Sequence, residues 1–272
     1  MAEVEVEFNV CKIILVISLL IVVNTNVFAK TDEEIAKTLE NPISTLVRVP
    51  IRLDYNRNIG IKDEGHSFTL NIYPVIPFSL NKNWTIVTRT SFAITHQKEI
   101  YPDSGTQNGL EDIDSSIFIA PNKPSIAGTK FGFGPIISIP TATDKLLGSG
   151  KWGLGPTIIF IKQDNAWTYG IRANHLWSVA GDNDRERVCS SLLQPMLSYT
   201  TTSAISFSLK SETKYDWVAK NWTVPINLLI SRVSKINGKR IKASIGLRYW
   251  AKTTDSSPEG FGVRTQITFM FK

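Results

Sequence analysis

The sequence predicts an all-β protein: a transmembrane, antiparallel, up-and-down β-barrel of about 12 strands. Three observations lead to this fold. Hydrophobic and polar residues alternate from residue 45 to the C-terminus, the connections alternate between short and long, and aromatic residues gather near strand ends. With 42% hydrophobic and 20% charged residues, the 272-residue chain is neither disordered nor a coiled coil. Its two cysteines exclude a disulfide scaffold.

The N-terminus predicts a signal peptide over residues 1–29. An apolar run from Ile13 to Val23 follows Lys12 and precedes the small-x-small sequence Val27-Phe28-Ala29. The run is too short to span a bilayer as a helix, so it reads as a cleaved export signal. The chain is therefore expected outside the cytoplasm.

Residues 30–44 predict a short periplasmic helix and linker. Thr31 and Glu34 form a capping box, and Asp32 and Glu33 suit the positive end of the helix dipole. Pro42 ends the helix. No other segment keeps a helical period for long.

From residue 45 to residue 272 the period is two, which predicts the barrel domain. In the first strand, Val47, Val49 and Ile51 alternate with Arg48 and Pro50. The predicted strands lie near 45–56, 68–80, 83–96, 110–120, 129–140, 151–162, 166–179, 188–200, 204–214, 222–234, 239–250 and 260–272. Strands of this length exceed the roughly 9–11 tilted residues that cross the hydrocarbon core. Strands of soluble proteins average about 5–6 residues.

The connections predict which rim of the barrel faces which compartment. Asn81-Lys82 is tight and Asn237-Gly238 is a type I′ hairpin signal, whereas 97–109 and 181–187 are long. Short turns on one rim and long loops on the other are typical of outer-membrane barrels, and an even strand count places both termini on the periplasmic side.

Aromatic placement favours a membrane barrel over a soluble two-sheet sandwich. A sandwich would bury tryptophan at strand centres, whereas here the large aromatics, Trp250 included, lie within a few residues of strand ends, as membrane interfaces select. The predicted interface girdle consists of Trp84, Trp152, Trp167, Trp177, Tyr199, Trp217, Trp222 and Tyr249.

The last strand carries an expected assembly signal. Ile267, Phe269 and Phe271 share one face and lie just before the C-terminus. An aromatic near the end of a closing strand resembles the signal that outer-membrane assembly machinery recognises. The expected partners are therefore this machinery, outer-membrane lipid and lipopolysaccharide.

Several segments resemble one bacterial family. They are the run Asn71–Leu80, the sequence Gly132-Phe-Gly-Pro135 leading into Pro-Thr-Ala-Thr143, the Lys-Trp-Gly block within Leu147–Pro156, and Asn174–Gly181. Together these resemble outer-membrane proteins classed as transporters, or as a "MetA pathway of phenol degradation" family, whose relatives often carry the label "neuromedin U". The resemblance implies an outer-membrane β-barrel whose substrate is not established. The acidic residues at the start of the leader depart from what the family would suggest.

With the apolar positions facing lipid, the alternate positions face the lumen. The predicted lumen-facing charged residues are Arg48, Arg52, Asp54, Arg89, Asp112, Asp114, Lys130, Arg172, Lys210, Glu212, Arg240, Lys242, Arg248 and Arg264. The excess of basic residues favours a passive pore for small solutes with an anionic or aromatic preference. Alternatively, these charges pair across the lumen and close it, leaving a non-conducting barrel that serves the envelope or binds through its loops at 97–109 and 181–187. The sequence supports both readings.

Enzymatic chemistry is a remote alternative. His175 is expected to face lipid near the outer rim, as the base of an outer-membrane lipid hydrolase would, but Ser178 lies on the opposite face of the strand. The acidic loop around Asp182 is interleaved with arginines, so it reads as solvated rather than as a metal site. We expect no enzyme activity, cofactor, metal or nucleic-acid partner.

Overall fold

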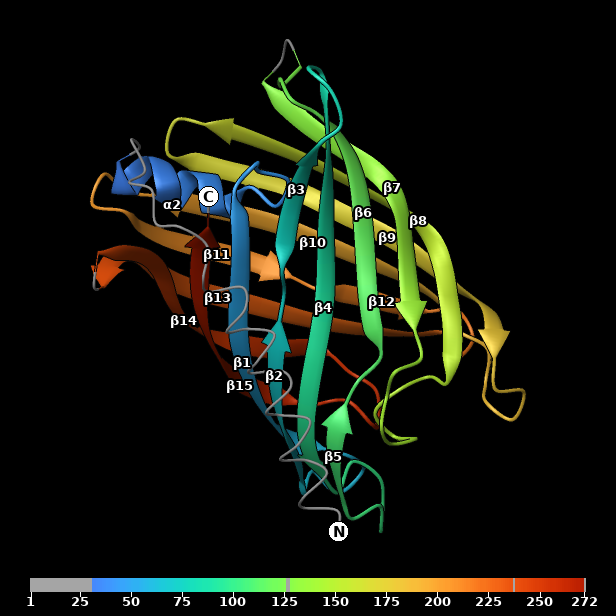
Figure 1. Cartoon of the computed structure of the whole chain (residues 1–272). Helices are drawn as coiled ribbons and strands as arrows, with labels where there is room; N and C mark the ends of the chain where they lie inside the picture. The colour runs from blue at the N-terminus through green and yellow to red at the C-terminus, as the bar shows by residue number, and fades with distance from the viewer. Residues whose placement is uncertain (1–30, 126–127, 237, 272) are drawn as a thin grey trace.

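The part of the chain that the structure describes contains one short helix and fifteen strand segments, which close into a barrel (Figure 1). This is a computed structural model that describes residues 31–125, 128–236 and 238–271. The predicted signal peptide lies outside the described residues. The elements are α2 (Asp32–Glu40), β1 (Val47–Ile59), β2 (Gly65–Ile72), β3 (Val75–Ser79), β4 (Trp84–Lys98), β5 (Thr106–Leu110), β6 (Ile113–Pro121), β7 (Thr129–Ile139), β8 (Lys151–Asp164), β9 (Trp167–Gly181), β10 (Cys189–Thr200), β11 (Ile205–Ser211), β12 (Thr213–Asp216), β13 (Asn221–Ile236), β14 (Lys239–Lys252) and β15 (Gly260–Phe271).

Pairing between the first and last strands closes the sheet. β1 and β15 run antiparallel from the pair Val47–Phe271 to the pair Tyr55–Val263. All other neighbours are antiparallel as well, and three strands are each split into two consecutive segments: β2 with β3, β5 with β6, and β11 with β12. The fifteen segments therefore make twelve strands, which confirms the predicted fold class.

Prolines explain two of the three interruptions. Strand β2 stops at Ile72 and β3 resumes at Val75, with Tyr73 and Pro74 between them. Ser211 pairs with Ile226 and Lys214 pairs with Thr223, so Pro225 of β13 lies opposite Glu212, between the end of β11 and the start of β12. Because proline has no N–H, the ladder loses a hydrogen bond at each place.

The third interruption is a one-residue bulge. Ile94 of β4 pairs with Leu110, but Ser91 pairs with Asp114, so one extra residue lies in the β5–β6 strand. A bulge of this kind re-aims the side chains around it. It also shifts the inward positions from the odd residues of β5 to the even residues of β6.

The two faces of the barrel differ as the alternation predicts, with one departure. Large hydrophobic side chains are exposed on the outer wall, and buried serine, threonine, asparagine and charged residues line the inside. Toward one end, however, part of the lumen is filled by an apolar cluster. It consists of Ile43, Val75, Val87, Phe118, Ala120, Ile159 and Ile161.

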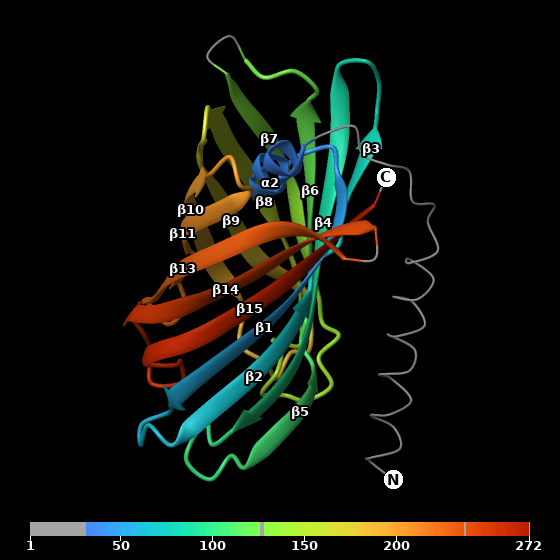
Figure 2. The ribbon, with the colours of Figure 1, turned by 90° about the vertical axis from the view of Figure 1, so that its left-hand side faces the viewer.

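Helix α2 lies in the mouth of the barrel at that same end, which we call the short-turn end because the tight β8–β9 and β13–β14 hairpins lie there (Figure 2). The capping box of Thr31 and Glu34 is present. Ile35 and Ala36 are buried against Ala204 and Val233. The opposite rim is the long-loop end.

One of the two predicted long loops is shorter than expected, and the other is docked onto its neighbour. The loop 97–109 is largely a hairpin, because β4 continues to Lys98 and β5 begins at Thr106. In the loop 181–187, Arg185 donates to the carbonyl oxygens of Lys145 and Ser149, so this loop is docked onto its neighbour. Among the described residues no helix is long and apolar enough to cross a membrane.

Candidate functional site

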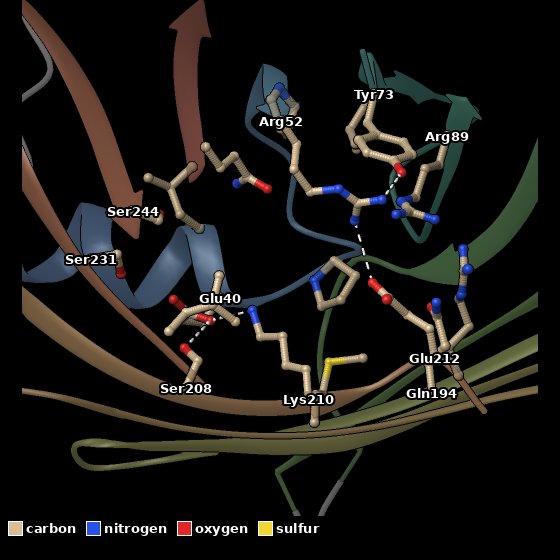
Figure 3. A pocket seen from close by; sticks show the side chains of 18 of the residues that line it. Glu40, Arg52, Tyr73, Arg89, Gln194, Ser208, Lys210, Glu212, Ser231 and Ser244 are labelled. Carbon is tan, nitrogen blue, oxygen red and sulfur yellow. Dashed lines mark hydrogen bonds and ion pairs between the residues drawn. The ribbon is translucent and has the colours of Figure 1, made fainter. Parts of the chain in front are cut away.

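The lumen contains two adjoining chambers. The inner chamber, of about 180 Å³, lies toward the short-turn end and is lined in part by Leu39 and Glu40 of α2. The outer chamber, of about 320 Å³, lies toward the long-loop end. Six residues line both chambers and so form the layer between them: Arg52, Tyr73, Arg89, Arg172, Gln194 and Glu212. Figure 3 shows several of these side chains converging from different strands.

Two residues of this layer, Arg52 and Glu212, belong to a closed network of arginines and carboxylates, which we call the ion-paired wall. It consists of Arg52, Asp54, Glu212, Arg248 and Arg264. Arg264 donates to Asp54 through Nε at 2.7 Å and to Glu212 through a terminal nitrogen at 2.9 Å. Arg248 reaches Glu212 at 2.9 Å, and Arg52 reaches Asp54 at 3.0 Å. Three cations thus share two buried anions.

The opposite side, the unpaired wall, carries arginines without carboxylate partners. It consists of Arg89, Arg172 and Asn174. Among the described residues no ion pair forms at Arg89 or Arg172, although Arg172 is only 6% exposed. The guanidinium of Arg89 lies over the ring of Tyr73, 4.9 Å from its centroid. Arg172 Nε and Asn174 Nδ2 are buried without an acceptor.

Tyr73 lies between the two walls. Its hydroxyl accepts a hydrogen bond from Arg52 and donates to Asn71 at 2.9 Å. Figure 3 shows Arg52 and Arg89 on opposite sides of this ring. Tyr73 therefore connects the ion-paired wall to the first arginine of the unpaired wall.

The C-terminal residue of α2 is fixed at the base of the inner chamber. Glu40 is 3% exposed; Lys242 and Lys210 donate to it, Lys210 at 3.0 Å, and Ser198 does so at 2.8 Å. Burial by itself raises the pKa of the Glu40 carboxyl, but the two lysines outweigh burial and hold the pKa well below its ordinary value. Glu40 is thus a charged anchor that keeps the helix in the mouth.

The structure gives the predicted lumen-facing residues different surroundings. Lys210 and Lys242 hold Glu40, and Arg48 donates to the carbonyl oxygen of Pro42 at 2.8 Å, behind the helix. Asp112 lies at the bulge, where it accepts from the backbone N–H of Ser149 at 2.7 Å. Asp112 therefore anchors a loop rather than pairing with an arginine across the lumen.

The remaining predicted charges fall in three places. Asp114 lines the outer chamber. Arg240 pairs with Asp32 of the helix at 2.5 Å. Lys130 is half-buried near the short-turn end of β7.

Sequence reasoning missed three residues that matter in the lumen. Tyr73 and Gln194 are in the shared layer, and Glu40 anchors the helix. The alternation of β2 and β3 already put Tyr73 on the polar face, so a search beyond charged residues would have found it. For Glu40 the sequence held no such signal, because nothing local shows that the helix enters the barrel.

The aromatic residues near the strand ends lie mostly on the outer wall. Seven of the eight girdle residues are exposed, from 40% to 53%, and Trp84 is half-exposed. Trp250 differs, because its Nε1 donates to Asn56 inside the barrel at 3.3 Å. On the closing strand, Ile267 and Phe269 are also exposed on the outer wall.

His175 has a partner that the sequence did not indicate. Its Nδ1 lies 2.7 Å from the hydroxyl of Ser191, which is its cross-strand neighbour on β10. The hydroxyl also accepts from Nε1 of Trp217 at 2.9 Å, and the thiol of Cys189 lies 3.6 Å from His175 Nε2. No group of three potential metal-ligating residues occurs among the described residues.

Comparison with known proteins supports the fold at low sequence identity. No protein-family model and no curated protein matches the chain. The structure is similar to the COG4313 outer membrane channel of Pseudomonas putida F1, with a TM-score of 0.68 and 11% identity over 84% of this chain and 96% of that one. It is also similar to the NanC porin, with a TM-score of 0.51 and 12% identity over 82% and 99% of the two chains.

The chain thus has the fold of outer-membrane channel barrels. Identities of this size show the fold alone, so the resemblance to the phenol-degradation family stays a prediction.

Proposed function

We propose that this protein is a passive outer-membrane pore for small solutes, with a preference for anions. The observation that carries the proposal is the pair of adjoining chambers inside a closed barrel, separated by a layer with more arginines than carboxylates. A fixed positive charge in a narrow, low-dielectric tube lowers the barrier to an anion and raises it for a cation. The export signal over 1–29, the linker over 30–44 and the barrel over 45–272 are part of this proposal.

The exposed outer wall supports the location. Side chains such as Leu228, Ile245 and Leu247 are more than half exposed in the middle of strands. Exposed apolar surface on this scale is stable only against lipid or another apolar partner. The aromatic residues at both ends of the strands suit the two interfaces of a bilayer. We assign Ile267, Phe269 and Phe271 as the assembly signal.

Recording in planar bilayers tests the pore. The wild-type protein is expected to give discrete conductance steps, with a reversal potential shifted toward chloride under a KCl gradient. A second recording uses a variant that lacks residues 31–40 and therefore has no α2 in the mouth of the barrel. Conductance only in the shortened protein would show that the helix plugs the pore. Silence in both proteins at both polarities would contradict the proposal and support the non-conducting barrel.

A second candidate, hydrolysis of lipid at the outer wall, is favoured by one contact. The 2.7 Å contact between His175 and Ser191 places a base beside a hydroxyl on the wall that faces lipid. Against it, the other nitrogen of His175 faces a thiol rather than an orienting carboxylate or amide. Release of fatty acid from phospholipid vesicles that disappears in Ser191→Ala would support hydrolysis, and no release by the wild type would exclude it.

A further inference from the structure

Two buried donors of β9 have no acceptor, whereas the third such nitrogen in the lumen, Arg52 Nε, lies 3.0 Å from a carboxylate oxygen of Asp54. Arg172 Nε and Asn174 Nδ2 lie two residues apart on the inward face of β9, and both residues line the outer chamber. Buried N–H groups in folded proteins are nearly always hydrogen-bonded, so an orphan pair beside a cavity indicates a missing acceptor. The acceptor that a guanidinium prefers is an anion.

The charge of the layer indicates the same ligand. Arg89 and Arg172 both line the two chambers, and neither has a carboxylate partner among the described residues. A buried cation without a counter-ion is unfavourable unless a mobile anion or water takes that place. Glu212 cannot serve, because Arg52, Arg248 and Arg264 already share it.

Next to these arginines the inner chamber has an apolar side. Val75, Phe118 and Met196 line it, and they come from β3, β6 and β10 on the same part of the barrel as Arg89 and Arg172. Val75 and Phe118 belong to the apolar cluster, and Met196 packs against it. A ligand in this chamber would therefore meet cations at one end and hydrocarbon along its side.

The volumes limit the size of the ligand. The inner chamber, of about 180 Å³, is comparable in volume to an engineered cavity of about 150 Å³ that binds benzene. It therefore accommodates an apolar body of about the size of a benzene ring. A second charged group placed against Phe118 and Met196 would have no partner on that side of the chamber.

We propose that the layer between the chambers is a binding site for a small monocarboxylate with an apolar body, such as a benzoate or a medium-chain fatty acid. The carboxylate lies between Arg89 and Arg172 and accepts from Asn174, and the apolar body lies against Phe118 and Met196. This site rests on the proposed pore, because it makes the lumen selective for one class of solute.

Fluorine NMR with 4-fluorobenzoate as the probe tests the site in detergent-solubilised protein. The full-length protein is expected to broaden and shift the probe signal, whereas 4-fluorobenzyl alcohol, its neutral analogue, stays unaffected. Hexanoate is expected to displace the probe at lower concentration than succinate or inorganic phosphate. If phosphate displaced the probe at the same concentration as hexanoate, the apolar side would have no role in binding. If 4-fluorobenzyl alcohol bound as tightly as 4-fluorobenzoate, the arginines would have no role.

Substitutions locate the site. Arg172→Gln and Arg89→Gln are each expected to weaken probe binding by about tenfold or more, the usual loss for a charge-assisted hydrogen bond. Arg232→Gln is the matched control, because Arg232 is exposed on the outer wall and its replacement changes the net charge equally. Unchanged binding in both lumen variants would overturn the proposal.

Folding is checked for each variant by heat-modifiable mobility in gels. Arg172→Lys, which keeps the charge but lacks Nε, is used if the glutamine variant does not fold, and it too is expected to bind the probe less tightly. Probe binding without conductance would contradict the proposed pore and leave the proposed binding site in place. Conductance without probe binding would contradict the binding site and leave the pore, so the two proposals fail separately.

Discussion

The two walls of the lumen contain equally buried arginines in opposite situations. Arg264 is 4% exposed and Arg172 is 6% exposed. The strand register places Asp54 directly opposite Arg264, whereas the partners of Arg172 on the neighbouring strands are Gln194 and Ile159. Burial alone therefore does not decide what an inward arginine does. A carboxylate at the paired position makes it structural, and an uncharged neighbour leaves it available for a ligand.

The largest expected effect comes from breaking the ion-paired wall. Asp54→Asn leaves three buried arginines with only Glu212 as counter-ion. Removing one partner from a buried network costs about 3–5 kcal/mol, because the remaining charges lose their compensation. This change in the free energy of unfolding is measured by unfolding the protein in detergent with urea, with the loss of heat-modifiable gel mobility as the readout.

The matched substitution on the other wall sharpens the comparison. Arg172→Gln removes a charge that has no partner, so the free energy of unfolding is expected to stay within about 1 kcal/mol of the wild type or to rise. If Arg172→Gln destabilised the protein as much as Asp54→Asn, Arg172 would have a structural role and the distinction between the walls would be lost.

The barrel could be predicted from the sequence because the features that indicate it are local and are repeated along the chain. Alternation over twelve strands, hairpin signals such as the dipeptide Asn237-Gly238 and aromatic residues near strand ends each depend on neighbours in the chain. Arg172 and Arg264, which the alternation along their strands assigned to the inward face, line the inner chamber.

What the sequence could not provide is the partner of each inward residue. In the alternative in which the charges pair across the lumen, Asp54, Asp112 and Glu212 would all meet neighbouring arginines. Asp54 and Glu212 do so, whereas Asp112 lies at the bulge and instead holds a loop. The apolar cluster inside the barrel was also unexpected. Its residues gather only after closure brings β3, β4, β6 and β8 around Ile43.

A smaller loss of stability is expected from releasing the helix. Glu40→Gln removes the anion between Lys210 and Lys242, and we expect a loss of about 2–3 kcal/mol, somewhat below that of a fully buried pair since Lys210 is partly exposed. Because α2 lies in the mouth of the barrel, the variant should also conduct more. Conductance equal to that of the wild type would show that the helix does not limit passage.

The pH dependence of helix docking follows from the lowered pKa of Glu40. A carboxyl with a lowered pKa in the folded state contributes its full stabilisation above its unfolded pKa and loses it only as the pH falls through the lower, folded value. The unperturbed value is 4.5. Wild-type conductance is therefore expected to be the same at about pH 4 as at neutral pH. An increase near pH 4.5 that is absent from Glu40→Gln would show that the lysines do not hold Glu40 charged.

Ion selectivity should respond to the unpaired wall and not to the outer wall. One unit charge a few ångströms from a passing ion in a water-filled lumen changes its energy by about 1 kcal/mol, which is about fivefold in a permeability ratio. Arg89→Gln and Arg172→Gln are each expected to reduce the preference for chloride over potassium by about this factor. Reversal potentials under a KCl gradient measure it, with Arg232→Gln as the control that should remain unchanged.

The smallest expected effect comes from Tyr73→Phe, which acts on the contact between the two walls. The ring remains over Arg89, but Arg52 loses the hydroxyl that accepts its hydrogen bond. Because Arg52 keeps Asp54 and Glu212, the free energy of unfolding should fall by only about 0.5–1.5 kcal/mol. A loss of stability as large as that of Asp54→Asn would mean that Tyr73, rather than the carboxylates, holds Arg52 in place. The structural network of the ion-paired wall would then include Tyr73 and reach Arg89.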